Sequence, residues 1–280
     1  MAGYWRFRNF ALPLDRTLVM GVVNVTPDSF SDGGLFQRVA DAVDHGRRLA
    51  GEGADILDIG GESTRPGAAP VSTDEERGRV LPVIEALAAG GHCVSVDTRH
   101  ADVAAAALDA GAAIVNDVTA GESDDEMFDV VARRRAGLVL MHMQGEPQTM
   151  QENPEYDDVV DDVGTYLAAR VDAAVRAGVR EQAVAVDPGI GFGKTLAHNL
   201  ALLAGIPRIA ATGRPVLIGT SRKSMFAKLL DLAVDERMEA TLATTVWAAM
   251  AGASIVRVHD VKETVQATKV TDAALALVVR

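Results

Sequence analysis

The sequence predicts an α/β protein that folds as a single-domain (β/α)8 TIM barrel with a short N-terminal extension. Three observations predict this class. Short β-branched runs alternate with helical stretches rich in Ala, Leu and Val eight times along 280 residues, as parallel strands with crossover helices require. Polar residues stand at the end of every run. No linker-like or low-complexity segment interrupts the alternation, so one domain is expected over residues 1–280.

The first elements are an extension and a polar loop. Residues 1–16 precede the first strand, and the first twelve suggest a small hairpin. After the first strand comes "NVTPDSFSDGG" (24–34), which fits a mobile lid hinged at Gly33 and Gly34. It fits equally a loop of Asx and ST turns in which Pro27 forms the turn.

The remaining elements follow from their local patterns. The runs predicted as strands cover 17–24, 54–60, 92–98, 112–118, 137–142, 183–189, 215–221 and 253–259. Between them, periodic stretches such as 38–53 and 100–112 predict helices. Gly53, Gly111 and Gly178 stand where helices end, a position that glycine often occupies. The segment 143–165 is predicted to be a longer acidic connection before the next helix.

The residues that follow the strands favour a closed barrel over an open doubly wound sheet. They are Asn24, the loop 60–67, Asp97, Asn116 with Asp117, His142, Asp187, the segment 221–223, and Arg257 with His259. In an open sheet the outer strands lie far from the ligand crevice. In a barrel all the strand ends line one mouth, where barrel enzymes carry their sites. The sequence therefore predicts a site at this mouth.

Composition narrows the functional classes. The net charge is −12 and the isoelectric point is about 4.9, which argues against nucleic acid or an anionic membrane as a partner. A single cysteine, Cys93, is expected to be buried and inert, and suits a reducing compartment. The N-terminus has no apolar core of a signal peptide, and no apolar run is long enough to span a bilayer. We expect a cytoplasmic protein.

Several motifs admit two interpretations when each is taken alone. Asp97, Asn116 and Asp187 could present acceptors and donors to a flat heterocycle with an amino-pyrimidinone edge, or could cap the helices that follow. Arg65 in "GGESTRPG" could hold a phosphate, or could be a solvated side chain of a surface loop. His142 is a lone histidine, which is more typical of a packed residue at the rim than of a ligand.

The later motifs suit an anion without matching a nucleotide fingerprint. "DPGIGFGKT" (187–195) contains "GKT", but Pro188 stands where a phosphate-binding loop needs glycine. "GTSRKS" (219–224) brings Arg222 and Lys223 to a strand end. Arg257 and His259 alternate along a strand, so both point to one side. They suit a phosphate, although an ordinary polar strand end has the same pattern.

Taken together, the motifs resemble the dihydropteroate synthase family. They are "NVTPDSFSDGG", "DIGGESTRPGA", "SVDT", "NDV", "MH", "DPGIGFGKT", "GTSRKS" and "RVHDV", in family order from about residue 18 to residue 270. The resemblance implies a transferase of folate biosynthesis with a pterin-binding (β/α)8 barrel. Such an enzyme condenses 6-hydroxymethyl-7,8-dihydropterin pyrophosphate with p-aminobenzoate to give 7,8-dihydropteroate and pyrophosphate. It also implies Mg2+ as cofactor, a homodimer, and sulfonamides as inhibitors.

The resemblance also assigns site residues. The groups that would hold the pterin are Asp97, Asn116, Asp187 and Lys223. Asn24 matches the magnesium ligand, and the groups around the pyrophosphate match Thr64, Arg257 and His259. The aminobenzoate region matches Ser63, Arg65, Pro66, Phe192 and Ser224, and the substrate-binding set further includes Gly219 and Arg222. The implied catalytic residues are Asp32, Lys223, Arg257 and His259, with Asp32 stabilising a pterin cation. Loops 25–34 and 61–68 resemble two mobile loops that close over the substrates.

Two other functional classes fit part of the pattern. A non-catalytic pterin-binding module or a methyltransferase-type pterin barrel would share the acidic and amide residues, but would lack the sets matched to pyrophosphate and aminobenzoate. A barrel acting on a sugar phosphate would account for Arg257 and His259, but not for three groups matched to a pterin edge. Binding of pterin with and without pyrophosphate would separate the three classes.

Overall fold

Eight parallel strands form a barrel in the computed structural model, which describes residues 3–25, 35–62, 71–146 and 149–278. The strands are β3 (Leu18–Asn24), β4 (Ile56–Gly60), β5 (Val94–Asp97), β6 (Ile114–Asp117), β7 (Gly137–Met141), β8 (Val184–Asp187), β9 (Leu217–Ile218) and β10 (Ile255–Val258). Their order in the sheet is β8-β7-β6-β5-β4-β3-β10-β9. A parallel bridge between Val186 and Val216 joins the two edge strands, so the sheet closes. The predicted fold class is confirmed, and each strand lies within its predicted run.

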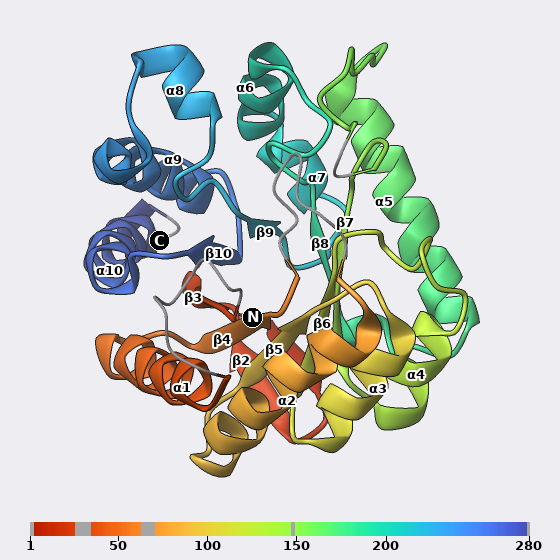
Figure 1. Cartoon of the computed structure of the whole chain (residues 1–280). Coiled ribbons are helices and arrows are strands. Elements are labelled where there is room, and N and C mark those ends of the chain that lie inside the picture. The colour runs from red at the N-terminus through yellow and green to blue at the C-terminus, as the bar shows by residue number, and fades with distance from the viewer. Residues whose placement is uncertain (1–2, 26–34, 63–70, 147–148, 279–280) are drawn as a thin grey trace.

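Helices form a ring outside the strands (Figure 1). They are α1 (Leu35–Glu52), α2 (Thr73–Ala89), α3 (Ala101–Asp109), α4 (Met127–Arg134), α5 (Val159–Arg176), α6 (Leu196–Ala204), α7 (Ile206–Ala210), α8 (Met225–Leu230), α9 (Met238–Met250) and α10 (Val261–Val278). Short 3-10 turns lie at η2 (Glu181–Ala183) and η3 (Val234–Glu236). None of the described helices is long and apolar enough to cross a membrane.

Side-chain caps fix where several helices begin. Ser72 accepts a hydrogen bond from the backbone N–H of Glu75 at the start of α2, and Asp158 accepts two at the start of α5. The Asp158 cap explains one difference from the sequence prediction. The acidic connection predicted over 143–165 ends earlier, because α5 begins at Val159.

The N-terminal extension closes the far end of the barrel. Strands β1 (Tyr4–Phe7) and β2 (Phe10–Pro13) pair as an antiparallel hairpin, as the sequence suggested. Trp5 and Phe7 are fully buried against the inward-facing residues of the strands, and Trp5 Nε1 donates to the Ala183 carbonyl at 2.9 Å. Cys93 belongs to this cluster, where burial raises its thiol pKa to about 12. The hairpin leaves the opposite, C-terminal mouth for ligands.

Candidate active site

Residues at the C-terminal ends of four neighbouring strands, β3 to β6, lie side by side across the mouth of the barrel. The strand register pairs Asn24 with Gly60, Gly60 with Asp97, and Asp97 with Asn116. Gly60 leaves space between its neighbours, since a Cβ there would lie 3.7 Å from Asn24 Oδ1 and 3.8 Å from Asp97 Oδ2. The fold therefore brings together three polar side chains that are 19 to 92 positions apart in the sequence.

Arg257 from β10 joins this row through two carboxylates. Its Nε donates to Asp58 Oδ2 at 2.6 Å, and its Nη2 donates to Asp97 Oδ2 at 2.6 Å. Asn116 Nδ2 donates to the same Asp58 oxygen at 3.1 Å. Asp58 is 0% exposed, and its Oδ1 has no hydrogen-bond partner within the described part of the chain. Asp58 is thus the buried centre of the network.

The charges in this network do not cancel. Burial is the main cause that raises the pKa of Asp97, Arg257 opposes the rise, and Asp58 adds to it. Burial by itself lowers the pKa of Arg257, but Asp58 and Asp97 raise it overall, so the guanidinium stays charged. Two carboxylates thus face one cation, which leaves acceptor capacity for a ligand that offers N–H groups.

Asp187, Lys223 and Phe192 form a second wall of the mouth. Asp187 lies at the end of β8, and its Oδ1 accepts from the Gly189 backbone N–H at 2.7 Å. Burial raises the pKa of Asp187, and the Lys223 ammonium opposes it. Burial lowers the pKa of Lys223 to about 8, and Asp187 opposes that change. The Lys223 Nζ donates to the Ile190 carbonyl and lies 4.6 Å from the centre of the Phe192 ring.

The residues after β9 and β10 lie in different surroundings. His259 is half-buried, and its Nδ1 lies 2.9 Å from Ser221 Oγ. Gly219 lies beside Arg257, since a Cβ on it would be 3.8 Å from the Arg257 Cβ. Arg222 is exposed, and its guanidinium forms a two-bond ion pair with Asp260. Ser224 is exposed just before α8. Arg222 and Ser224 therefore keep their substrate-binding roles as predictions.

Five predicted site residues lie outside the described residues. They are Asp32 in the first loop, and Ser63, Thr64, Arg65 and Pro66 in the second. Their roles remain predictions from the sequence.

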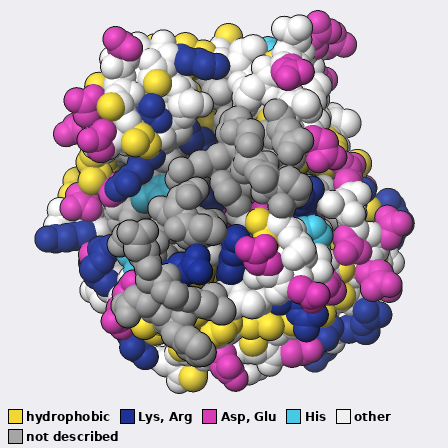
Figure 2. All heavy atoms as spheres, in the orientation of Figure 1, with side chains coloured by type: hydrophobic (Ala, Val, Ile, Leu, Met, Phe, Trp, Pro, Cys, Tyr) yellow, Lys and Arg dark blue, Asp and Glu magenta, His cyan; other side chains and the backbone are white. Residues whose placement is uncertain are grey.

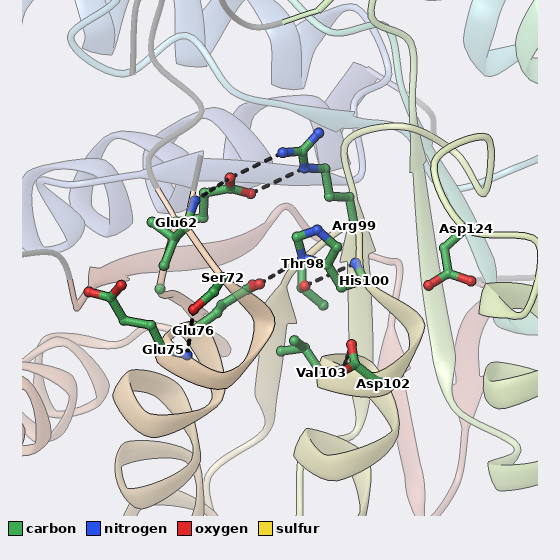
Figure 3. Close-up of polar contacts among 12 residues, drawn as sticks. Glu62, Ser72, Glu75, Glu76, Thr98, Arg99, His100, Asp102, Val103 and Asp124 are labelled. Atoms are coloured by element: carbon green, nitrogen blue, oxygen red, sulfur yellow. Dashed lines mark hydrogen bonds and ion pairs between the residues drawn. The ribbon is translucent and has the colours of Figure 1, made fainter. Parts of the chain in front are cut away.

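An acidic and basic cluster lies where the second loop leaves and rejoins the fold (Figure 3). Glu62, Glu76 and His100 have ligand atoms within 4.8 Å of one another, so this group could hold a metal ion. Each carboxylate already has a partner: Arg99 donates two hydrogen bonds to Glu62 at 3.2 Å, and His100 Nδ1 lies 2.8 Å from Glu76 Oε2. Glu62 also accepts from the Val71 backbone N–H at 3.3 Å, so it ties together the chain on both sides of 63–70.

The charged side chains around the mouth are distributed differently from what the negative net charge of the chain suggests. Figure 2 shows Lys and Arg side chains near the middle of this face, whereas most Asp and Glu side chains lie toward its edge. A negatively charged protein with local cations at its mouth can still attract an anionic ligand, because field strength there depends on the nearest charges.

Two functional candidates were missed by sequence reasoning. Asp58 stands inside an otherwise apolar strand, and this position was the only local signal for it. Lys194 lies within "GKT" and carried no predicted role, yet it is 1% exposed and donates to the carbonyl of Phe192 in the same loop. His142 is buried at the rim and packs against Tyr166, as the sequence suggested.

Comparisons with known proteins agree with this geometry. Residues 20–259 match the family described as pterin binding enzyme. The chain is 46% identical over 267 residues to the dihydropteroate synthase of Escherichia coli strain K12, covering 95% of this chain and 94% of that protein. A dihydropteroate synthase structure from Xanthomonas albilineans with 4-aminobenzoic acid superposes with a TM-score of 0.92 at 47% identity, covering 99% of each chain. Another from the same organism, in complex with 7,8-dihydropteroate, has a TM-score of 0.88 at 45% identity and covers 98% of this chain and 99% of that one.

Proposed function

The chain belongs to the pterin binding enzyme family and is a dihydropteroate synthase; we propose that it ionises the pterin C–O bond before the aminobenzoate attacks. The observation that carries this proposal is the network that joins Asp58, Asp97, Asn116 and Arg257, because it places acceptors for a heterocycle beside a cation for an anionic leaving group. The two proposed substrates are dihydropterin pyrophosphate, which the motif resemblance implies, and p-aminobenzoate, which is bound in the Xanthomonas albilineans structure.

The pterin is held by the acidic and amide groups of the mouth. Asp97 and Asp187 accept hydrogen bonds from ring and exocyclic N–H groups, while Asn116 and Lys223 donate to ring acceptors. The burial of Asn116 and Asp187 and the half-buried positions of Asp97 and Lys223 support this assignment, because polar groups removed from water gain most from a ligand that completes their hydrogen bonds.

The bond-breaking step sends its electron pair to the pyrophosphate oxygen. Arg257 and His259, with Thr64 from the second loop, bind the pyrophosphate and stabilise the charge that grows on it. The pterin carbon becomes cationic, and Asp32 in the first loop is assigned to stabilise it. The amine nitrogen of p-aminobenzoate then forms the new C–N bond and releases a proton to water. Closure of loops 25–34 and 61–68 keeps water from capturing the cation.

The aminobenzoate lies on the Phe192 side of the mouth. Its ring packs against Phe192 and the stem of Lys223, and the substrate-binding set continues through Ser63, Arg65, Pro66, Gly219, Arg222 and Ser224. The contact between the Lys223 ammonium and the Phe192 ring supports this assignment, because it brings an aromatic ring and a positive charge together on this side of the mouth.

Formation of dihydropteroate by the purified protein tests the proposed function. A coupled assay with both substrates and magnesium is expected to yield dihydropteroate and pyrophosphate in equal amounts. Release of pyrophosphate without incorporation of aminobenzoate would instead indicate a hydrolase.

Asn24 is the proposed ligand of Mg2+. Its neutral amide oxygen is a hard donor of the kind that magnesium accepts, and Gly60 beside it has no side chain that would cover this oxygen. When bound, magnesium neutralises charge on the leaving pyrophosphate. The cluster of Glu62, Glu76 and His100 is a less suitable magnesium site, because Arg99 already occupies both Glu62 oxygens.

Asn24→Ala is expected to lower turnover far more than it weakens binding of a pterin that lacks pyrophosphate. The reason is that Asn24 would act only through the metal and the leaving group. Turnover against magnesium concentration, with calorimetry of the pterin alone, measures both effects. Equal losses in the two measurements would refute the role, and Asn24→Asp, which keeps an oxygen ligand, serves as the matched variant.

The pH dependence of pterin use is expected to follow Lys223. Its pKa is lowered to about 8, so the ammonium is charged below that pH and neutral above it. The kcat/KM for dihydropterin pyrophosphate should therefore fall as pH rises through about 8. Lys223→Arg keeps the charge across this range and should remove the fall, even if its overall rate is lower. If kcat/KM of Lys223→Arg still fell as pH rises through about 8, the pH dependence would belong to another group.

The homodimer and the cytoplasmic location are also part of this proposal. Exposed apolar side chains gather on α8, α9 and α10, where they include Leu229, Leu230, Trp247, Met250 and Val270. Such a concentration is typical of a protein interface. Light scattering should give twice the mass of the chain, and a monomer at micromolar concentration would contradict the dimer.

A further inference from the structure

The loop from Pro188 to Thr195 is held by side chains at successive carbonyls. The carbonyl of Ile190 accepts a hydrogen bond from the side chain of Lys223. The next carbonyls accept from other side chains: Gly191 from Gln151 at 2.6 Å, Phe192 from Lys194 at 2.9 Å, Gly193 from Tyr156 at 2.8 Å, and Thr195 from Asn199 at 2.8 Å. Gly189 is required by its surroundings, because its φ is +68° and a Cβ would lie 1.9 Å from the His142 carbonyl oxygen. The loop is therefore fixed in one conformation by groups from several elements.

Lys194 is the buried member of this set. Its ammonium donates to the Phe192 carbonyl at 2.9 Å, the His142 carbonyl at 3.4 Å and His142 Nδ1 at 2.9 Å. Three acceptors thus satisfy its three protons. Burial and Lys194 lower the pKa of His142 to about 3, so the ring is neutral. A charged Lys194 ammonium can only donate, which assigns Nδ1 as the acceptor and the ring proton to Nε2.

This contact connects the end of β7 to the aminobenzoate side of the mouth. His142 directly follows β7, and its backbone N–H donates to the Asp187 carbonyl at 3.0 Å, so its position is set by two strands. Through its hydrogen bond to the Phe192 carbonyl, Lys194 fixes the backbone of Phe192 relative to His142. The Phe192 ring lies next to the Lys223 ammonium.

We propose that Lys194, anchored by His142, is a positioning residue that holds Phe192 in place for the aminobenzoate. The inference rests on the proposed function, since it concerns one of the two substrates of that reaction. Lys194 touches neither substrate and acts through the loop backbone. The pterin is assigned mainly to Asp97, Asn116 and Asp187. In the described part of the chain their side chains form hydrogen bonds with groups other than Lys194, and only Asp187 interacts with its charge, so the two substrates should respond differently.

Lys194→Met tests the proposal, because it keeps the length and apolar stem of the side chain and removes the ammonium. We expect the KM for aminobenzoate to rise at least tenfold, while the calorimetric Kd for dihydropterin pyrophosphate changes less than threefold. Two variants of His142 test the same contact without relying on the folding of Lys194→Met. His142→Asn places an amide oxygen near the position of Nδ1 and should retain most of the affinity, whereas His142→Leu should behave like Lys194→Met.

A pH profile separates positioning from general support of the fold. Burial lowers the pKa of Lys194 to about 7, with Asp187 opposing and Lys223 adding to the change. The other groups that face it are His142 and the ring of Tyr156, whose centre lies 5.9 Å from Nζ. Aminobenzoate affinity in the wild type should therefore weaken above pH 7, and Lys194→Met should lose this dependence.

Distinct outcomes would overturn the inference and the proposed function. Equal weakening of both substrates, or a lower melting temperature with unchanged aminobenzoate KM, would make Lys194 a structural lysine only. A wild-type protein that forms no dihydropteroate would contradict the proposed function itself. The test needs only the full chain and the two substrates.

Discussion

Arg257→Ala is expected to lower kcat for dihydropteroate formation by about 10²–10³-fold, as loss of a single preorganised donor to a developing anion does. The variant has no guanidinium to stabilise the leaving pyrophosphate. The same change leaves Asp58 and Asp97 buried without their cation, so the free energy of unfolding should fall by about 3–5 kcal/mol. Steady-state kinetics and urea unfolding on the same samples measure the two effects separately.

Variants of His259 test whether the two residues share one ligand. His259→Ala alone should also lower kcat, and the double variant should lose less than the sum of the two singles, because groups that bind one anion act as a unit. Strict additivity would argue against a shared pyrophosphate. Arg48→Ala provides the surface control, since Arg48 is an exposed arginine paired with Glu52 at 2.5 Å, and its kinetics should match the wild type.

Asp58→Ala is expected to be the most disruptive change in the carboxylate network. It would remove the acceptor shared by Arg257 and Asn116 and leave the half-buried Arg257 guanidinium with Asp97 as its remaining carboxylate partner, so the free energy of unfolding should fall by about 3–5 kcal/mol. Activity should also fall steeply, because Arg257 would lose the contact that orients it.

Asp58→Asn separates charge from hydrogen bonding at this position. Both donors use Asp58 Oδ2, while Oδ1 has no described partner, so the asparagine oxygen can take the place of Oδ2. We expect this variant to fold with a smaller loss of stability than Asp58→Ala and to retain measurable turnover. Asp109→Ala, which breaks an exposed pair with Arg134, should change stability by less than about 1 kcal/mol. If Asp58→Ala behaved like this control, the central role of Asp58 would be wrong.

Much of the barrel could be predicted because its signals are local. Each strand is a short apolar run that ends at a polar residue, and each observed strand lies within its predicted run. Boundaries were less predictable. The cap at Asp158 depends on side-chain geometry rather than on hydrophobic periodicity, so the start of α5 was placed too late.

The candidate site was predictable where motifs mark it. Asn24, Asp97 and Asp187 end strands, and Asn116 stands one residue before the end of β6. The end of a strand in a parallel barrel lies at the mouth. Asp58 was not predictable as the centre of the network, because no local pattern says that β10 will bring Arg257 to it across 199 positions.

The sequence by itself determined the number of barrel strands, the end of the barrel at which the polar side chains gather, and the polar residues at the strand ends, because these depend on local periodicity and on chain order. Only the tertiary structure decided which of those groups share a proton donor or a charge. The pairing of Arg257 with Asp58 and Asp97, and the anchoring of Lys194 on His142, arise from strand register and barrel closure. Hydrogen bonds act over about 3 Å, so contacts between distant segments are fixed only when the barrel closes.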